Sequence, residues 1–417
     1  MSEFVLTPLK YIVVDRISNG VGLPAEHENP DWPRYIRTTD IAGPRALRDD
    51  IWYSQPPELL KQAGVERGDL LLTNAGTVGK AYLHTSDESA VFAGYLTRVR
   101  PNPLKADSRY VAYCCESQPY WDQINTGATR STIDNFSSGK FQDLRISIPP
   151  LDTQRRIADM LDTETVRIDT LIEKNERVLE LLSQRATALI TAAVTGAVEV
   201  DQFGDPRPPR RGHVMSAGVL HNDVPLQYLA QVEYGMGQPP PLSEDGVAIL
   251  RATNIERGKI TVRNLQRARV DDLPLGRAPL LREGEILVVR SGAYTGDSAI
   301  VTSAWAGSAP GYDLRVTPDH ALVDPRFLAW SLLSTFCLDQ FNLAKLRAAQ
   351  AHLNAEELAA TRVPSPPLET QRRIADMLDA EIEKTDALKS TVSRQQELLR
   401  LRRQALITTA VTGQIEV

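Results

Sequence analysis

The chain has 417 residues, enough for two or three domains with separate cores, and its 47 basic and 53 acidic residues give a net charge of −6. Three cysteines and six histidines without metal-ligand spacing argue against a disulfide framework and a zinc motif. No apolar run approaches ~18 residues and the first residues do not resemble a signal peptide, so we expect a cytoplasmic protein without a membrane span.

Residues 1–150 are predicted to form a mixed α and β domain. The apolar run at 69–72 is bounded by glycine and polar turns and predicts a strand. Residues 108–123 have helical spacing, and we interpret their aromatic side chains as core residues. The segment Gly76-Thr77-Val78-Gly79-Lys80-Ala81 is similar to a phosphate-binding loop, but its glycines are too close together and no Ser or Thr follows the lysine.

Residues 151–200 are predicted to form a long helix. Seam residues recur at alternating spacings of four and three over about five heptads, which is typical of a coiled coil. They are Ile157, Leu161, Glu164, Ile168, Leu171, Asn175, Val178, Leu182, Arg185 and Leu189. Pro149-Pro150 and Asp152-Thr153 provide a start signal, and Thr195-Gly196 a stop. Such a helix is roughly 60 Å long.

A Pro- and Arg-rich connection at 201–222 leads to a second mixed domain at 223–367 and a second helix at 368–417. In this domain, the run at 285–289 predicts a strand, and residues 325–341 have helical spacing. Six basic residues against one acid lie between Arg251 and Arg269. Local basic charge of this kind suits phosphate binding despite the negative net charge, although a solvated face is an equally good interpretation.

The second helix repeats the first. Residues 149–200 recur at 366–417 without insertion or deletion, and 31 of the 52 aligned positions are identical. Both copies contain TQRRIADMLD and end in ALIT, a small residue and AVTG. Further matches 217 positions apart link Pro8 to Pro225 and Tyr95 to Tyr312, while the offset drifts between them. A duplication on this scale predicts an internal two-fold plan, with variable domains and constant helices.

Charged seam residues favour an antiparallel arrangement of the two helices. A parallel pair in register would place Glu164 against Glu381 and Arg185 against Arg402. An antiparallel pair brings the glutamate end of one helix to the arginine end of the other. We therefore predict an α+β protein in which two mixed α/β domains are joined by an antiparallel coiled coil.

The duplicated motifs, each after a variable domain, resemble the specificity subunit of type I restriction-modification systems. The resemblance covers essentially the whole chain. It implies two target recognition domains, each recognising one half of a bipartite sequence in double-stranded DNA, and helices that set the spacer and dock two methyltransferase subunits. It also implies restriction subunits as further partners. S-adenosylmethionine, ATP and Mg are then expected in those partners and no cofactor in this chain, which is expected not to be an enzyme.

Polar loops at matching places in the two domains are the predicted DNA-binding sites, because base edges and phosphates are contacted by such side chains. They are Arg37, Thr38, Thr39, Asn74, Thr77, Lys80, Thr129, Arg130 and Ser131 in the first domain, and Arg251, Thr253, Asn254, Arg290, Ser291, Tyr294, Gln350 and His352 in the second. A competing interpretation is structural: Asn74 and Ser291 lie beside glycine and could shape turns, and Arg37 could pair with a local carboxylate.

Polar residues that are identical in the two helix starts are the predicted partner-binding site: Gln154, Arg155, Arg156, Gln371, Arg372 and Arg373. Packing on the adjoining domain or capping of the helix would also explain their identity. Two other function classes stay open: a coiled-coil scaffold whose end domains bind proteins, and an enzyme with an unrecognised active site. Steep salt dependence of binding would separate a DNA-binding protein from a scaffold.

Overall fold

The computed structural model describes residues 4–50, 52–127, 136–197, 221–274, 276, 280–347 and 352–415. Its chain contacts divide it into two compact units. The first unit contains Met1–Glu176 and Ser393–Val417, and the second contains Arg177–Val392. Each unit therefore includes one globular part, one half of the first long helix and one half of the second.

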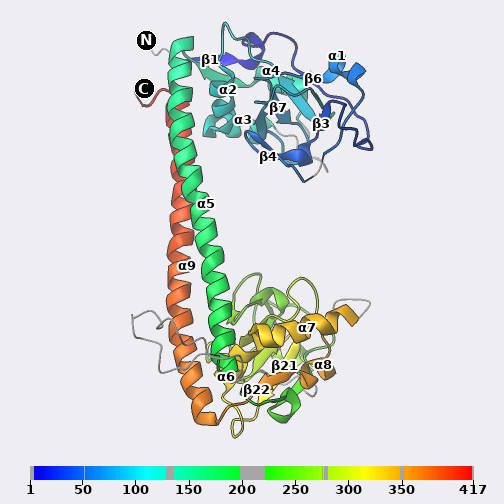
Figure 1. Ribbon diagram of the computed structural model, residues 1–417, viewed down its shortest axis with the longest axis vertical. Helices are drawn as coiled ribbons and strands as arrows, with labels where there is room; N and C mark the ends of the chain where they lie inside the picture. Colours follow the sequence, from blue (N-terminus) through cyan, green and yellow to red (C-terminus); the bar gives the residue numbers. More distant parts are fainter. Residues whose placement is uncertain are drawn as a thin grey trace. The chain divides into compact units, whose positions relative to one another are not determined.

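The first unit contains three small sheets and a two-stranded ribbon (Figure 1). One sheet has the order β2-β10-β7-β8, a second β3-β9-β6, and β4 pairs with β5. The strands are β2 (Ser18–Asn19), β3 (Arg34–Ile36), β4 (Ile41–Gly43), β5 (Ala46–Leu47), β6 (Gly64–Val65), β7 (Leu70–Thr73), β8 (Ala81–Leu83), β9 (Ala90–Phe92) and β10 (Leu96–Val99). The ribbon joins β1 (Val5–Pro8) to β11 (Arg145–Ile148), so it closes the globular part directly before the long helix.

The remaining elements of the first unit are helical. They are η1 (Leu9–Tyr11), η2 (Thr38–Asp40), η3 (Pro57–Leu59), α1 (Leu60–Ala63), α2 (Ser108–Glu116), α3 (Gln118–Gly127) and α4 (Ser138–Asp143). The segment predicted as helical at 108–123 is two helices, because the chain turns at Ser117, whose hydroxyl donates to the Cys114 carbonyl at 2.7 Å. Tyr113 is buried, as predicted for a core aromatic residue.

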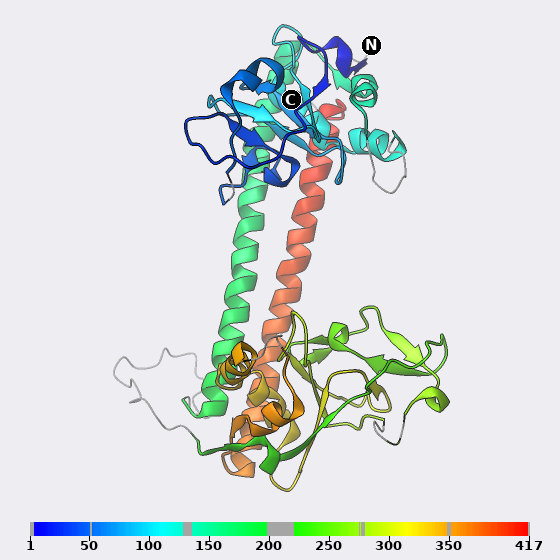
Figure 2. The ribbon, with the colours of Figure 1, turned by 90° about the vertical axis from the view of Figure 1, so that its right-hand side faces the viewer.

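The second unit repeats this plan (Figure 2). Its sheets have the orders β13-β21-β18-β19 and β17-β14-β20, β15 pairs with β16, and β12 pairs with β22. The strands are β12 (Asp223–Pro225), β13 (Ala230–Tyr234), β14 (Val247–Leu250), β15 (Ile255–Glu256), β16 (Lys259–Ile260), β17 (Gln266–Ala268), β18 (Ile286–Val288), β19 (Ser298–Ile300), β20 (Ala309–Pro310), β21 (Leu314–Pro318) and β22 (Arg362–Pro364). The helices are η5 (Leu226–Tyr228), η6 (Ala252–Asn254), η7 (Val270–Asp272), α6 (Pro325–Leu332), α7 (Thr335–Arg347) and α8 (Ala355–Ala360).

The long helices are α5 (Leu151–Thr195) and α9 (Leu368–Val411). Each begins directly after two prolines, Pro149-Pro150 and Pro366-Pro367. Each is followed by a glycine with positive φ, Gly196 at 78° and Gly413 at 72°. Glycine adopts this left-handed conformation without a Cβ clash, so it terminates the helix. Of the predicted connection at 201–222, all but the last two residues lie outside the part that the structure describes.

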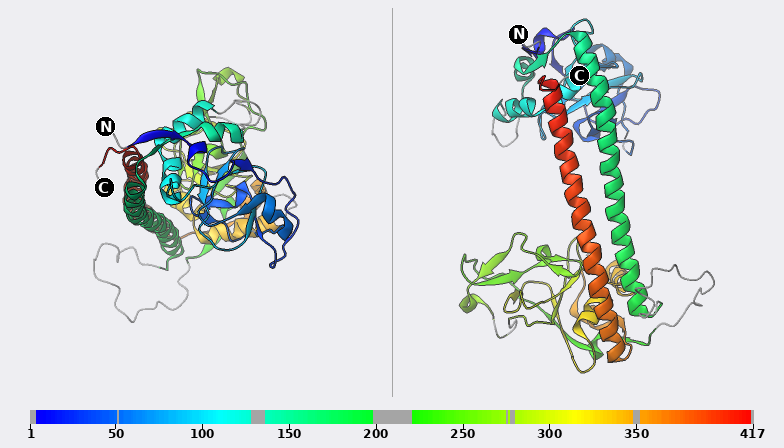
Figure 3. Two further views of the ribbon diagram at one scale, coloured as in Figure 1. Left: turned by 90° about the horizontal axis from the view of Figure 1, so that it is seen from above. Right: turned by 90° about the vertical axis from the view of Figure 1, so that its left-hand side faces the viewer.

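The helices run antiparallel, as contacts within each unit demonstrate (Figure 3). In the first unit, the start of α5 and the end of α9 share one core, which includes Ile157, Leu161 and Ile407. In the second unit, the end of α5 and the start of α9 share another, which includes Ile190 and Ile374. The long α5 and the mixed units confirm the predicted fold class.

The charged residues that favoured this orientation do not pair with one another across the two helices. Glu164 pairs with Arg167 and Glu381 with Lys384, each three residues along its own helix. Arg185 and Arg402 are exposed, as are the seam residues Leu171 and Val178. Residues three apart on a helix are neighbours, so a lysine or arginine at this spacing can pair with the glutamate on its own helix. In the first unit, the described pairs that join α5 to α9 are instead Asp169 with Arg403 and Glu176 with Arg400.

Candidate nucleic-acid interface

The first predicted loop is a turn closed by its own side chains. The backbone N–H of Arg37 donates to the Asp40 carboxylate at 2.9 Å, and the Arg37 guanidinium donates to the same carboxylate at 2.6 Å. Asp40 is buried, and a buried carboxylate needs a charged partner to offset its lost hydration. The hydrogen bond to Asp40 raises the pKa of Arg37. Arg37 also lies over the ring of Tyr53 at 4.4 Å. Its side chain therefore holds the turn, which supports the structural interpretation and leaves Thr38 and the exposed Thr39 as the candidate contacts.

The equivalent turn in the second unit uses Asn254 in place of the aspartate. Asn254 is fully buried, accepts from the Arg251 backbone N–H at 3.2 Å, and donates to the carbonyls of Thr261 and Arg263. The prediction that Asn254 contacts bases is wrong, because every polar atom of its amide has a partner within the domain. Arg251 donates to the Asn264 carbonyl, whereas Thr253 is exposed.

The second predicted loop connects β7 to β8. Asn74 is buried, and its amide donates to the Gly94 carbonyl and to the Thr97 hydroxyl, both at 3.2 Å. The amide N–H groups of Asn74 therefore shape the turn, which favours the structural interpretation of this residue. Thr77 and Lys80 are exposed on the same loop and remain candidates.

The corresponding loop connects β18 to β19 and brings together residues that the sequence keeps apart. Ser291 forms an antiparallel bridge with His352, and the Arg290 carbonyl accepts from the Leu353 N–H at 2.8 Å. The Arg290 guanidinium lies between the rings of Tyr234 and Tyr312, at 4.7 and 4.3 Å. Stacking on two aromatic faces fixes the orientation of a guanidinium and leaves its edge for hydrogen bonding. Predicted residues Arg290, Ser291 and His352 thus form one cluster.

A cavity of about 370 Å³ joins the two loops of the second unit. Predicted residues Thr253 and Tyr294 line it together with Arg257 and Arg263. These two arginines belong to the basic run noted in the sequence but are not among the predicted contacts. Arg257 has a φ of 22°, a strained value for a side chain of this size, and such strain is concentrated at functional positions. The basic run is therefore the signal that identifies these residues.

Tyr95 and Tyr312 are further candidates that the sequence reasoning missed. They are aligned at the 217-residue offset, and both are exposed, by 67% and 50%. An exposed tyrosine offers a ligand both an aromatic face and a hydroxyl group. Their repeated Gly-Tyr context was the available signal. Predicted residues Thr129, Arg130, Ser131 and Gln350 lie outside the described residues.

The repeated helix start divides into buried and exposed positions. Gln154 accepts from the Asp107 N–H at 3.0 Å and donates to the carbonyls of Lys105 and Pro149. Gln371 makes the same contacts with Asp324, Leu322 and Pro366. Both side chains are buried, so the prediction that they bind a partner is wrong. Their contacts explain instead why both copies retain glutamine.

The four arginines of the motif have a different environment. Arg155, Arg156, Arg372 and Arg373 are all exposed. Among the described residues, Arg155 has a long contact of 3.4 Å with Asp152, three residues earlier. These side chains can therefore reach a partner, and the prediction for them stays open.

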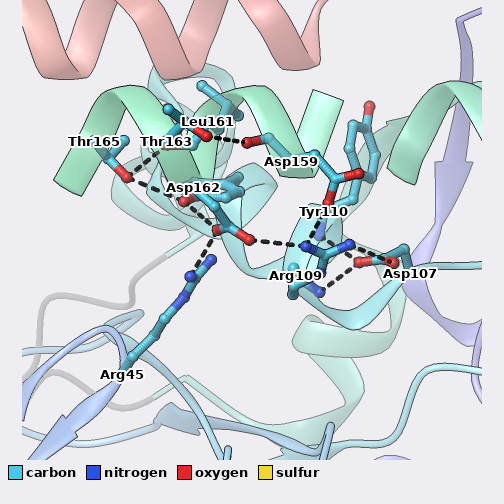
Figure 4. Close-up of polar contacts among 10 residues, drawn as sticks. Arg45, Asp107, Arg109, Tyr110, Asp159, Leu161, Asp162, Thr163 and Thr165 are labelled. Atoms are coloured by element: carbon cyan, nitrogen blue, oxygen red, sulfur yellow. Dashed lines mark hydrogen bonds and ion pairs between the residues drawn. The ribbon is translucent and has the colours of Figure 1, made fainter. Parts of the chain in front are cut away.

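An ionic cluster attaches the globular part of the first unit to α5 (Figure 4). Asp162 on α5 accepts from Tyr113 Oη at 2.7 Å and from Arg109 Nη1 at 2.9 Å, and pairs with Arg45 of the β4–β5 hairpin at 2.7 Å. Burial alone would raise the pKa of Asp162, but these donors hold it below its ordinary value. Arg109 also pairs with Asp159 on the helix. The hairpin that follows the first candidate loop is thereby fixed to the long helix.

Comparison with known sequences identifies the family. The family model described as "Type I restriction modification DNA specificity domain" matches residues 23–181 and 260–398, more than half of the chain. The chain belongs to this family. Each matched range contains most of one globular part and the first part of the long helix that follows it.

Individual relatives agree with this assignment to the type I specificity family. The chain is 25% identical over 309 residues to the type I restriction enzyme EcoBI specificity subunit of Escherichia coli, which covers 71% of this chain and 64% of that protein. It is 21% identical over 399 residues to the EcoKI specificity subunit of Escherichia coli strain K12, covering 92% and 83%. A solved chain from a type I restriction-modification system has a TM-score of 0.66 at 17% identity, covering 99% of this chain and 98% of its own. At that identity, the structural likeness supports the fold.

Two further observations concern the part of the chain that the structure describes. None of the described helices is long and apolar enough to cross a membrane. Within the described residues, no group of three or more His, Cys, Asp or Glu side chains is arranged to hold a metal ion.

Proposed function

We propose that this chain recognises a DNA sequence in two halves, one per globular part. The observation that carries the proposal is a constant framework with variable loops. Framework contacts recur 217 positions apart, as for Gln154 with Asp107 and Gln371 with Asp324. The exposed loop residues differ: Thr77 and Lys80 in the first unit, and Tyr294 with its arginines in the second. Two equivalent supports with different contact surfaces suit two different half-sites.

The loops provide the chemistry that such recognition needs. Exposed Thr39, Thr77, Lys80, Thr253 and Tyr294 offer hydroxyl and ammonium groups for base edges and phosphates. Turns closed by buried partners, such as Arg37 with Asp40, hold the neighbouring side chains in fixed positions. Less ordering is then required on binding, which favours affinity and selectivity.

The long helices are proposed to set the spacing between the half-sites and to dock two methyltransferase subunits. Arg155 and Arg156, with their equivalents Arg372 and Arg373, are identical and exposed in both units, as a surface for two copies of one partner requires. We assign methylation and cleavage to the methyltransferase and restriction subunits, which would bind S-adenosylmethionine, ATP and Mg. This chain would perform no chemistry itself.

A map of base modification in the host genome, with and without the gene for this chain, tests the proposal. Loss of methylation at one motif made of two short halves with a fixed gap is the expected result. A lost motif that is continuous would contradict the bipartite assignment. If no motif is lost, DNA binding by the purified complex should still weaken steeply with salt, and binding insensitive to salt would favour a protein scaffold.

A further inference from the structure

The two units differ at the hairpin that contacts the root of the long helix. In the first unit, β4 and β5 pair Ile41 with Leu47, and Arg45 immediately precedes β5. In the second, β15 and β16 pair Ile255 with Ile260, and Gly258 immediately precedes β16. The second hairpin therefore has no side chain at the place from which Arg45 extends.

Arg45 fills a defined site in the first unit. Its guanidinium lies over the ring of Tyr113 at 4.9 Å. It also pairs with Asp162 at 2.7 Å (Figure 4). The planar cation thus contacts an aromatic face and a carboxylate at once, a combination that suits guanidinium better than ammonium. Tyr113 is only 2% exposed.

The second unit retains the receptor for such a group. Trp330 replaces Tyr113, and its Nε1–H donates to Asp379 Oδ1 at 2.8 Å, as the Tyr113 hydroxyl does to Asp162. A Cβ built on Gly258 would lie 3.2 Å from Leu333 Cδ1 and 3.6 Å from Trp330 Cζ3, so position 258 faces α6 at this ring. A cavity of about 450 Å³ opens there, lined by Gly258, Trp330, Asp379, Arg326 and Glu283. The side chain of Asp379 is 40% exposed, against 25% for Asp162.

The basic residues of the second hairpin do not occupy this cavity. Lys259 pairs with Asp386, and Arg257 lines two other cavities. Arg326 pairs with Asp376 and Asp379, and the Asp379 carboxylate can still pair with a second cation. The equivalent carboxylate in the first unit, Asp162, binds two cations at once. Its Oδ1 accepts from Tyr113 and pairs with Arg45, while its Oδ2 accepts from Arg109.

We propose that the cavity between Gly258, Trp330 and Asp379 binds a guanidinium group from a ligand that is not part of this chain. The ligand is a free guanidinium compound or the arginine side chain of a protein. Nucleic acid is a poor occupant, because Asp376, Asp379 and Glu283 would repel phosphate. The first unit has its own guanidinium at this place, so we place the proposed site in the second unit.

Three probes test this site on the full chain: agmatine, the peptide Gly-Gly-Arg-Gly-Gly, and its lysine counterpart. The indole N–H signal of Trp330, assigned with Trp330→Phe among the five tryptophans, reports binding by NMR. We expect a saturable shift with a guanidinium probe and binding at least about fivefold weaker for the lysine peptide. Binding of agmatine alone would identify a small-molecule ligand, and binding of the arginine peptide alone a protein side chain. No saturable shift, or equal binding of lysine, would overturn the proposal.

Two variants locate the binding. Asp379→Asn should weaken it by about tenfold, since the charge-assisted contact is lost. Arg45→Gly should create a second site in the first unit, visible as probe-dependent protection of α2 in hydrogen exchange in addition to α6. If Asp379→Asn destabilises the second unit, the Arg45→Gly result decides alone. Unchanged affinity in a folded Asp379→Asn, or no new protection in Arg45→Gly, would contradict the assignment.

Discussion

The buried glutamine of each helix start offers a direct test of how the repeated motif works. Gln154 makes three hydrogen bonds, of 3.0, 3.0 and 2.8 Å, to backbone groups that flank α2 and α5. One of these groups is the N–H of Asp107. The carboxylate of Asp107 caps α2 by accepting from the backbone N–H groups of Arg109 and Tyr110. Gln154→Ala removes all three bonds and leaves a methyl group in a site with no exposure.

The expected cost follows from those contacts. A neutral hydrogen bond contributes about 0.5–1.5 kcal/mol net, and a buried group left without a partner costs about 1–3 kcal/mol. Allowing water to reach part of the site, we expect Gln154→Ala to lower the free energy of unfolding of the first unit by about 2–4 kcal/mol. Gln371→Ala should have a similar effect on the second unit, because it makes the equivalent bonds.

Hydrogen exchange in a urea series is the suitable assay, because a chain of two units need not unfold in one step. Gln154→Ala should destabilise peptides of the first unit and leave those of the second unchanged. Exposed Arg155→Ala is the matched control, with an expected effect within about 0.5 kcal/mol. A Gln154→Ala protein of native stability that fails to bind its methyltransferase would refute this reasoning and restore a docking role for the glutamine.

Three further outcomes are expected. The pKa of Asp162 is depressed in the folded chain, so its contribution to stability is complete above the unfolded value of about 3.9 and is lost progressively as pH falls through the lower folded value. Asp162→Asn should therefore destabilise the first unit more at pH 6 than at pH 3, unlike exposed Asp152→Asn, and an equal loss at both pH values would contradict this. Arg155→Glu with Arg372→Glu should reduce the number of methyltransferase subunits bound, and an unchanged complex mass by light scattering would argue against docking there. The double variant Arg257→Ala, Arg263→Ala should reduce the slope of log K for DNA binding against log salt concentration by about 2. Arg362→Ala, which removes an ion pair with Asp223, should leave this slope unchanged.

Sequence reasoning succeeded where the signal is periodic or repeated. The heptad pattern and the duplication predict two equivalent helices and an antiparallel arrangement. Glu164 nevertheless pairs with Arg167 and not with the second helix, because a neighbour three residues along the same helix is an equally attractive partner. A seam pattern defines a helix face, but it does not say which charges on that face meet.

Prediction of the site was less accurate, because a residue can be identical in the two repeats for two reasons: it contacts the rest of its own unit, or it binds a partner. Gln154 is retained for contacts with residues about 47 positions away, which no local pattern displays. Asn74 and Asn254 have the polar character of base-contacting residues, yet both satisfy buried backbone or hydroxyl groups. Exposure decides between these roles, and exposure depends on tertiary packing. The loops remain candidate DNA-binding sites because they carry exposed polar residues: Thr39, Thr77, Lys80, Thr253 and Tyr294.

The offsets between the two units explain how the loops can change while the framework does not. Contacts at the helix root keep the 217-residue spacing, as in Arg109 with Asp162 and Arg326 with Asp379. The hairpins differ in length, with five residues between Ile41 and Leu47 but four between Ile255 and Ile260. This difference in length does not detach either hairpin from its long helix, because each hairpin has its own cation in an ion pair there. Arg45 pairs with Asp162 on α5, and Lys259 pairs with Asp386 on α9. A loop beside a hairpin that is anchored in this way can gain or lose residues without moving the helix surface offered to a partner. DNA recognition by the loops can then differ between the two units while docking of the partner on the helices stays the same.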